Sequence, residues 1–223
     1  MNLIHFLKSA ARNESLLRSY ENDFVKSLSL SGKGIDLGAK SKDASYYQYI
    51  NLSLVEKLDF VDFYHHDDDV IQVNLEKPFP IENNSYDFVI LFNVMEHIFN
   101  YQNVLDETSR ILKNGGELHA FVPFMWRFHP DPNDYFRFTS QALEKLLQEA
   151  GFEEVKVVPI CYGPFKAGAI PIGHALKFRI LRYFLYSMGI IFDKAISLVA
   201  KGSKNFSLGY YFYGKKSDTA ETQ

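Results

Sequence analysis

The chain has 223 residues, 47% of them hydrophobic, which is enough to bury the core of one α/β unit. Its net charge of −3 provides no broad basic field, so the composition does not favour a nucleic-acid partner. The single cysteine, Cys161, cannot form an internal disulfide, and the first residues lack the pattern of a secretory signal. We therefore expect a cytoplasmic protein.

The chain divides into three kinds of segment. Apolar residues recur at helical spacing over residues 1–30, which predicts an amphipathic helical cover for a sheet. Over residues 31–160, short apolar strands alternate with helical stretches, the pattern of a parallel sheet with helices on both faces. Residues 204–216 contain an alternating, aromatic strand that is expected to complete the same sheet, and residues 161–203 form a helical insertion before it.

Four sequence features follow one another in a specific order. A short apolar run over residues 34–37 ends at Gly38, where a buried strand must turn sharply. An apolar strand is expected at 86–92, followed by Glu96-His97, and a helix and glycine turn are expected at 107–116. This order resembles the class I S-adenosylmethionine-dependent methyltransferases that act on small molecules. The resemblance implies a Rossmann-like α/β fold with a seven-stranded, mostly parallel sheet.

The resemblance also implies a cofactor site at the carboxyl ends of the first, second and fourth strands. Asp36 and Gly38 correspond to the family's first motif, and Asn93 would lie along the sulfonium of S-adenosylmethionine. Asn74 and Leu75 correspond to the positions that meet the adenine.

Three positions depart from the family pattern. Lys40 stands where a second glycine is usual, and Asn74 replaces the usual aspartate. The second strand is expected at residues 47–53, so Ser53 takes the place of the acid that binds the ribose hydroxyls. Two interpretations remain open: a methyltransferase with a modified cofactor loop, or a non-catalytic module of the same fold that binds a partner through its insertion.

Residues 123–139 resemble the "P-F … H-x-x-P-x-D-Y-x-R-x-T" segment of a methyltransferase subgroup associated with surface-glycan biosynthesis. His129 is the candidate catalytic base, because an imidazole titrates near neutral pH, and His97 is a second candidate or a structural residue. Asp134, Tyr135 and Arg137 are the candidate acceptor-binding residues. The alternative is that Asp134 and Arg137 pair with each other and only stabilise the loop.

The insertion at 161–203 is apolar with interspersed lysines and arginines, and its unbroken apolar runs are too short to span a bilayer. Gly189 is expected to divide it into two helices. One interpretation is a basic amphipathic surface that contacts a membrane or a lipid-linked acceptor. The other is a helical pair that covers the active site or forms a homodimer face.

The tract His65-His66-Asp67-Asp68-Asp69 contains metal-ligand types, but consecutive loop residues cannot easily face one ion, so no metal is expected. The predicted function is O-methylation of a sugar hydroxyl or related polar metabolite in surface-glycan biosynthesis. The expected cofactor is S-adenosylmethionine, and the expected partner is a small-molecule or glycan acceptor.

Overall fold

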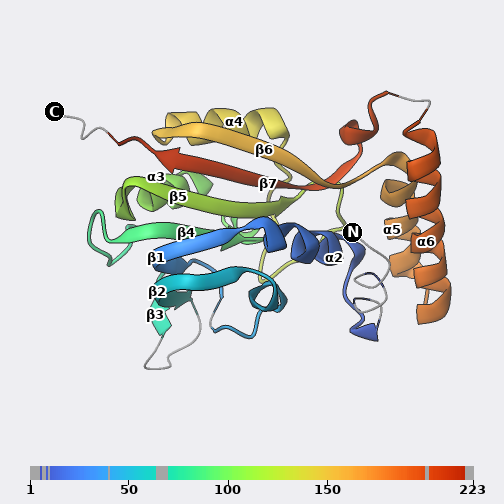
Figure 1. The fold of residues 1–223 in the computed structure, drawn as a ribbon, viewed down its shortest axis with the longest axis horizontal. Coiled ribbons are helices and arrows are strands. Elements are labelled where there is room, and N and C mark those ends of the chain that lie inside the picture. Colours follow the sequence, from blue (N-terminus) through green and yellow to red (C-terminus); the bar gives the residue numbers. More distant parts are fainter. Residues whose placement is uncertain are drawn as a thin grey trace.

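The computed structural model describes residues 6, 9, 11–39, 41–63, 70–198 and 201–218, and it confirms the predicted fold (Figure 1). Seven strands form one sheet in the order β3-β2-β1-β4-β5-β7-β6. Only β7 runs antiparallel to its neighbours. The strands are β1 (Ser29–Asp36), β2 (Asn51–Asp62), β3 (Val70–Gln72), β4 (Tyr86–Phe92), β5 (Leu112–Pro123), β6 (Phe152–Tyr162) and β7 (Ser207–Lys216).

Helices cover both faces of the sheet. The core on one face contains side chains of α3 (Tyr101–Ile111) and α4 (Ser140–Glu149). The core on the other face contains side chains of α2 (Leu16–Phe24), α5 (Pro164–Ala175) and α6 (Arg179–Ile196). The strand order reverses between β1 and β4, and this switch point is where α/β sheets of this kind bind ligands.

The second strand lies later in the chain than the sequence suggested. Residues 45–48 form a short 3-10 helix, and β2 runs from Asn51 to Asp62. The parallel register pairs Asp36 of β1 with Phe60 of β2, so the carboxyl end of β2 is at Asp62. Ser53 lies near the amino end of β2, and its expected position at the end of the strand was wrong.

The segment after β6 forms a helical hairpin of α5 and α6 at one end of the sheet (Figure 1). The expected break at Gly189 was wrong, because α6 continues through this residue and the two helices are divided at residues 176–178. A Cβ atom on Gly189 would lie 3.3 Å from the Phe165 carbonyl oxygen and 3.4 Å from Ala169 Cβ. The glycine therefore permits close packing of the two helices.

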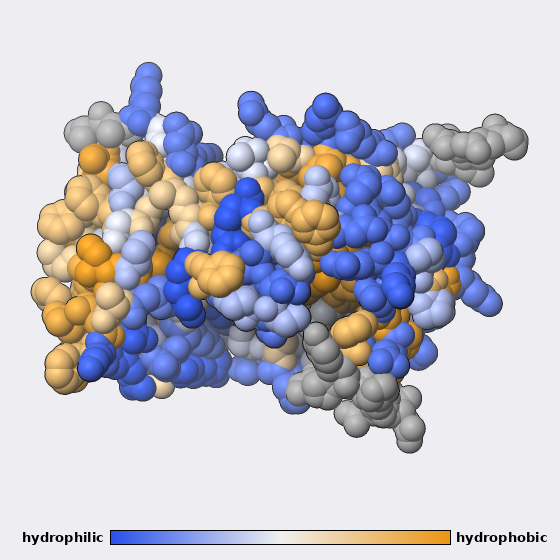
Figure 2. Space-filling view, turned by 180° about the vertical axis from the view of Figure 1, so that it is seen from behind, coloured by the Kyte–Doolittle hydropathy of each residue, from blue (hydrophilic) through white to orange (hydrophobic). Residues whose placement is uncertain are grey.

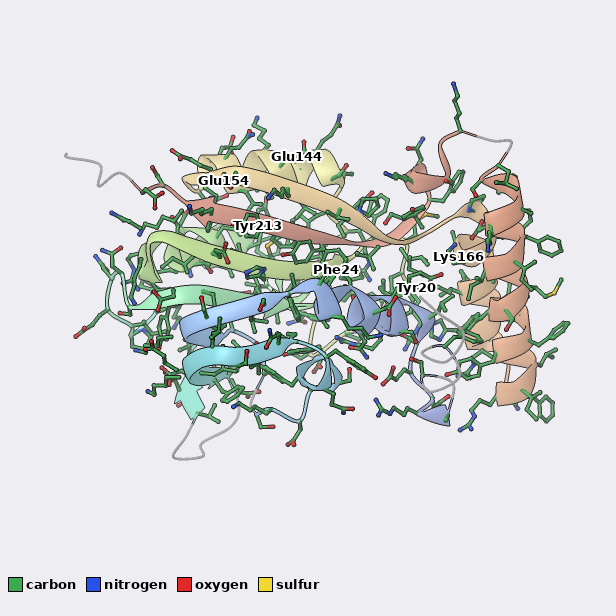
Figure 3. All side chains as sticks on the ribbon, viewed as in Figure 1. Tyr20, Phe24, Glu144, Glu154, Lys166 and Tyr213 are labelled. Carbon is green, nitrogen blue, oxygen red and sulfur yellow. The ribbon has the colours of Figure 1, made fainter. Side chains whose placement is uncertain are left out.

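A buried ion pair joins α5 to α6. Asp193 of α6 accepts hydrogen bonds from the N–H groups of Phe165 and Lys166, and its Oδ2 lies 2.9 Å from Lys166 Nζ. Lys166 also lies 6.0 Å from the ring centroid of Tyr20 on α2, and Figure 3 shows these two side chains where α2 meets the hairpin. Asp193 thus caps the amino end of α5, which its own Gly163 cannot do.

The outer side of the hairpin is apolar. Figure 2 shows hydrophobic side chains gathered at the end of the molecule that α5 and α6 form. The exposed large apolar residues of this segment are Phe165, Ile172, Phe178, Ile180, Leu181, Phe184, Ile191, Phe192 and Leu198. Among the helices described, none combines the length and the apolar character that crossing a bilayer requires.

Candidate active site

A cavity of about 400 Å³ opens at the switch point of the sheet. Its walls contain Leu37 and Gly38 after β1, Asp62 at the end of β2, and Asn93 after β4. The loop that follows β5 contributes residues 131–133 and Tyr135 to the opposite wall. One cavity therefore joins the strand ends to the loop that the sequence marks as the acceptor site.

Asp36 lies under this cavity and does not line it. Its carboxylate is buried and accepts hydrogen bonds from the hydroxyls of Tyr46, at 2.6 Å, and Tyr47. Burial raises the pKa of Asp36 to about 6, although these hydrogen bonds oppose the shift. The backbone N–H groups of Gly38 and Ala39 also donate to Asp36, so its carboxylate stabilises the turn after β1.

Gly38 brings the turn after β1 against the end of β4. A Cβ atom at this position would lie 2.2 Å from Val94 Cγ2, so no larger residue fits without displacing Val94. Lys40, the departure from the glycine pattern, lies outside the described residues.

The acid at the end of β2 is Asp62, and it lines the cavity. This is the place where the family resemblance implies a ribose-binding acid, and Ser53 does not line the cavity. The departure expected at this position therefore came from misplacing the strand. The apolar residues Leu58, Phe60 and Val61 shortly before Asp62 are the sequence signal that could have located it.

Asn74, Leu75 and Asn93, which the sequence analysis assigns to the cofactor site, line the cavity. Asn74 Oδ1 accepts the Glu76 N–H at 2.9 Å, which fixes the turn that contains the side chain. Asn93 has a left-handed φ of 56°, and its side-chain amide donates to Glu21 of α2 at 3.3 Å. The end of β4 is thereby joined to α2.

His97 and Tyr135 also line the cavity and connect two of its walls. His97 Nδ1 lies 2.5 Å from the Asn133 carbonyl oxygen. The Tyr135 N–H donates to the Glu96 carbonyl oxygen at 2.8 Å. These two contacts hold the loop after β5 against the short 3-10 helix Met95–His97.

The imidazoles of His97 and His129 both lie close to the buried carboxylate of Glu96. Glu96 is 0% exposed, and its Oε1 lies 3.6 Å from His97 Nε2 and 3.7 Å from His129 Nε2. The two rings meet edge to face with centroids 5.0 Å apart. The Glu96 carboxylate is the main cause of a raised pKa of His129. The sequence motif includes Glu96, but no pattern in the sequence indicates that this side chain is buried.

Asp134 and Arg137 pair with each other, as the structural alternative predicted. Arg137 donates to both carboxylate oxygens of Asp134, at 2.5 and 2.6 Å, and holds the pKa of Asp134 down at about 2. Asp134 Oδ2 in turn accepts a hydrogen bond from the backbone N–H of His129 at 2.8 Å. Neither residue of this pair, nor His129, lines the cavity, so the pair positions His129 from behind.

Comparisons with known proteins agree with this arrangement. The model of the methyltransferase domain family matches residues 31–120. A probable S-adenosylmethionine-dependent methyltransferase of Mycobacterium tuberculosis is 29% identical over 102 residues, which make up 43% of this chain and 37% of that protein. The match thus spans little more than a third of that relative.

Solved structures show the same fold at low sequence identity. Phosphoethanolamine N-methyltransferase 2 of Haemonchus contortus, solved with phosphomonomethylethanolamine and S-adenosylhomocysteine, has a TM-score of 0.55 and 15% identity over 88% of this chain and 52% of that chain. A putative sarcosine dimethylglycine methyltransferase of Galdieria sulphuraria has a TM-score of 0.55 and 16% identity, and the match covers 96% of this chain and 87% of that chain. Residues 31–120 thus match the methyltransferase domain family, and the chain has the fold of class I S-adenosylmethionine-dependent methyltransferases.

Proposed function

We propose that this protein transfers a methyl group from S-adenosylmethionine to an oxygen atom of a small polar acceptor. The observation that carries the proposal is the single cavity, which joins the ends of β1, β2 and β4 to the loop at 131–135. Donor and acceptor would therefore meet in one cavity, as an in-line displacement requires.

The cavity residues fit the cofactor. The Asp62 carboxylate is suited to accept hydrogen bonds from two ribose hydroxyls, and charge strengthens such bonds. The turn at Gly38 exposes backbone beside the cavity, and Asn74 and Leu75 supply a polar and an apolar wall for an adenine. A volume of about 400 Å³ lies within the usual range of small-molecule sites.

S-adenosylmethionine supplies an electrophilic methyl group, which the acceptor oxygen takes as the carbon–sulfur bond breaks and its electron pair remains on sulfur. The chain's own residues orient that oxygen and remove its proton. His97 is in the cavity wall, with Glu96 and His129 directly behind it. The proton of the hydroxyl therefore leaves toward this cluster.

A sugar hydroxyl is the acceptor that the cavity favours. Asp131 and Asn133 give the acceptor side polar groups, and the half-exposed ring of Tyr135 beside Phe99 gives a surface on which a sugar ring can stack. The resemblance of the same loop to enzymes of surface-glycan biosynthesis supports this choice. Labelled-methyl assays with nucleotide sugars and small amines would test it, and methylation of amines alone would contradict it.

Isothermal titration with S-adenosylmethionine and S-adenosylhomocysteine tests the donor site directly. We expect micromolar binding by the wild type and at least about tenfold weaker binding by Asp62→Ala, because charge-assisted hydrogen bonds are lost. Ser53→Ala is the matched control and should bind as the wild type does. No binding by the wild type would instead support the non-catalytic, partner-binding interpretation.

A second proposal concerns the α5–α6 hairpin, which we infer rests on an anionic membrane surface. Phe178 is 75% exposed, Ile180 88% and Phe184 62%, and these side chains lie on the outer side of the hairpin. Residues 161–206 carry seven lysines and arginines but one acid, Asp193, which is paired with Lys166. A cationic apolar surface is complementary to acidic lipids, whereas two copies of it would repel each other.

Cosedimentation with vesicles of neutral lipid, with and without phosphatidylglycerol, tests this second proposal. We expect binding that requires the acidic lipid and falls at least about tenfold in Phe178→Glu/Ile180→Glu, because burial of both side chains is lost. Leu54→Glu, at an apolar site on β2 that is 66% exposed, is the control. Concentration-dependent dimerisation without vesicle binding would indicate a protein interface instead.

A further inference from the structure

We propose that Glu96, His97 and His129 form a binding site for one divalent transition-metal ion at the edge of the cavity. One ligand atom from each residue lies within 4.8 Å of the other two. Glu96 and His97 belong to the 3-10 helix after β4, and His129 belongs to the loop after β5. Because β4 and β5 are parallel, both segments lie at the same edge of the sheet. Its chemistry, two imidazoles and one carboxylate, suits zinc, manganese and similar ions.

The spacing of the ligand atoms fits one ion. Ligand atoms about 2.1 Å from an ion in a tetrahedral site lie about 3.4 Å from one another. Glu96 Oε1 lies 3.6 Å from His97 Nε2 and 3.7 Å from His129 Nε2. These two separations are within a few tenths of an ångström of the tetrahedral value, and all three ligand atoms lie within 4.8 Å of one another.

The state of Glu96 is the second, independent observation. Its side chain is fully buried, and neither carboxylate oxygen has a hydrogen-bond partner among the described residues. An ionised carboxylate in that position is costly unless a positive charge lies beside it. An ion between the three side chains supplies that charge.

The outer hydrogen bonds of both imidazoles point the Nε2 atoms at Glu96. His97 Nδ1 lies 2.5 Å from the Asn133 carbonyl oxygen, so its proton is held on Nδ1 and Nε2 is free to coordinate. A backbone carbonyl that fixes the tautomer in this way is characteristic of metal-binding histidines.

His129 is held in the same way. Its Nδ1 lies 3.2 Å from the Arg127 carbonyl oxygen and 3.3 Å from Asp134 Oδ2. Arg137 Nη2 is also 3.3 Å from Nδ1, but it already donates to Asp134 Oδ2 at 2.6 Å and to the Arg127 carbonyl at 3.0 Å. Since both Nη2 protons are used, Nδ1 of His129 carries its own proton and donates it.

Three protein ligands leave coordination positions open, and His97 lies in the cavity wall. An acceptor oxygen in the cavity could occupy such a position, where the ion would lower its pKa so that its proton is released to solvent. With an ion bound, the cluster would promote loss of this proton through the ion; without one, the proton would pass to the imidazoles themselves. Ion binding stands independently, whereas this catalytic use rests on the proposed function.

The test is metal binding by the whole 223-residue chain after chelator treatment. Titration with Zn²⁺ or Mn²⁺ should give one tight site, and Co²⁺ should give a visible absorption spectrum typical of nitrogen and oxygen ligands. Glu96→Gln, His97→Ala and His129→Ala should each weaken binding at least about tenfold, because each removes a ligand. Circular dichroism establishes that each variant is folded.

The tract at 65–69 lies outside the described residues and supplies the matched control. His65→Ala/His66→Ala should retain the site. Loss of binding in this control alone, or no binding by the wild type, would overturn the proposal. Anomalous scattering from a crystal of the metal-soaked wild type needs no variant, and an ion elsewhere than between Glu96, His97 and His129 would overturn it too.

These readouts separate the two proposals. Cofactor titration of the metal-free protein reports on the donor site, and metal titration without cofactor reports on the three ligands. Metal binding without cofactor binding would overturn the proposed function but leave the ion site standing. Cofactor binding with no metal would do the reverse.

Discussion

The edge of the cavity and the α5–α6 hairpin depart from ordinary burial in opposite ways. At the cavity edge, three carboxylates, those of Asp36, Glu96 and Asp134, have almost no exposed surface. On the hairpin, large apolar side chains such as Ile180 face solvent. Both arrangements cost free energy in the isolated protein, and buried charge and exposed apolar surface are the two observations that most often mark a binding site.

The contrast extends to how the charges are paired. Asp193, the buried acid of the hairpin, accepts two backbone N–H groups and a lysine, so its role is complete within the fold. Glu96 lacks such partners among the residues that the structure describes. The buried acid of the hairpin therefore has its partners within the fold, while apolar side chains of the hairpin are exposed to solvent. At the cavity edge the carboxylates are buried, and that of Glu96 has no hydrogen-bond partner among the described residues.

The largest effect is expected on the hairpin side from Asp193→Ala. This change leaves the Lys166 ammonium buried without a partner and removes the cap of α5, so the free energy of unfolding should fall by about 3–5 kcal/mol. Urea denaturation measures it. Glu149→Ala removes an exposed ion pair on α4 and should cost less than about 1 kcal/mol. Equal costs for the two would contradict the distinction.

The cavity edge should show its buried charge in the pH dependence of stability. The pKa of Asp36 is raised to about 6 by burial, whereas aspartates of an unfolded chain titrate near 4. The folded state therefore holds this proton more tightly, and the contribution favours folding below about pH 4 and is lost as the pH rises through about 6.

Asp36→Asn removes this titration. Relative to the variant, the wild type should lose about 2–3 kcal/mol of stability between pH 4 and pH 8. Urea denaturation of both proteins across that range measures it, with Asp106→Asn on the outer side of α3 as a control for the substitution. Parallel stability curves for wild type and Asp36→Asn would show that Asp36 is not buried as the structure has it.

A smaller effect is expected where the two helices of the hairpin touch. Gly189→Val places a branched side chain against the Phe165 carbonyl and Ala169, and the overpacking should cost about 1–3 kcal/mol. Thermal unfolding measures it. A neutral or stabilising result would mean that α6 breaks or bends at Gly189, as the sequence had suggested.

The smallest effect should have the opposite sign. Gly168 lies within α5, and a Cβ atom added there would meet nothing within 4 Å among the described residues. Gly168→Ala should therefore raise the free energy of unfolding by about 0.5–1 kcal/mol, because alanine loses less backbone entropy in a helix. Destabilisation by this variant would place a packing contact on the exposed side of the hairpin.

The sequence supported some site residues better than others for a physical reason. Gly38, Asn74, Leu75, Asn93, His97 and Tyr135 line the cavity, because each directly follows a strand or lies in a loop whose place the motif order determines. Ser53 was placed wrongly because the strand was assigned to the first aromatic run after Gly38. In the structure, Tyr47 of that run and the preceding Tyr46 donate their hydroxyl hydrogens to Asp36.

The sequence by itself indicated the mostly parallel seven-stranded sheet and the location of the cavity, because the order of its motifs resembles that of a known methyltransferase family. Only the tertiary structure decided which charges are satisfied. Glu96 and His129 are 33 positions apart in the chain. The sequence was consistent with an Asp134 that faces the acceptor and also with an Asp134 that pairs with Arg137. Whether such side chains meet a ligand or each other depends on distances between loops, which no local pattern encodes.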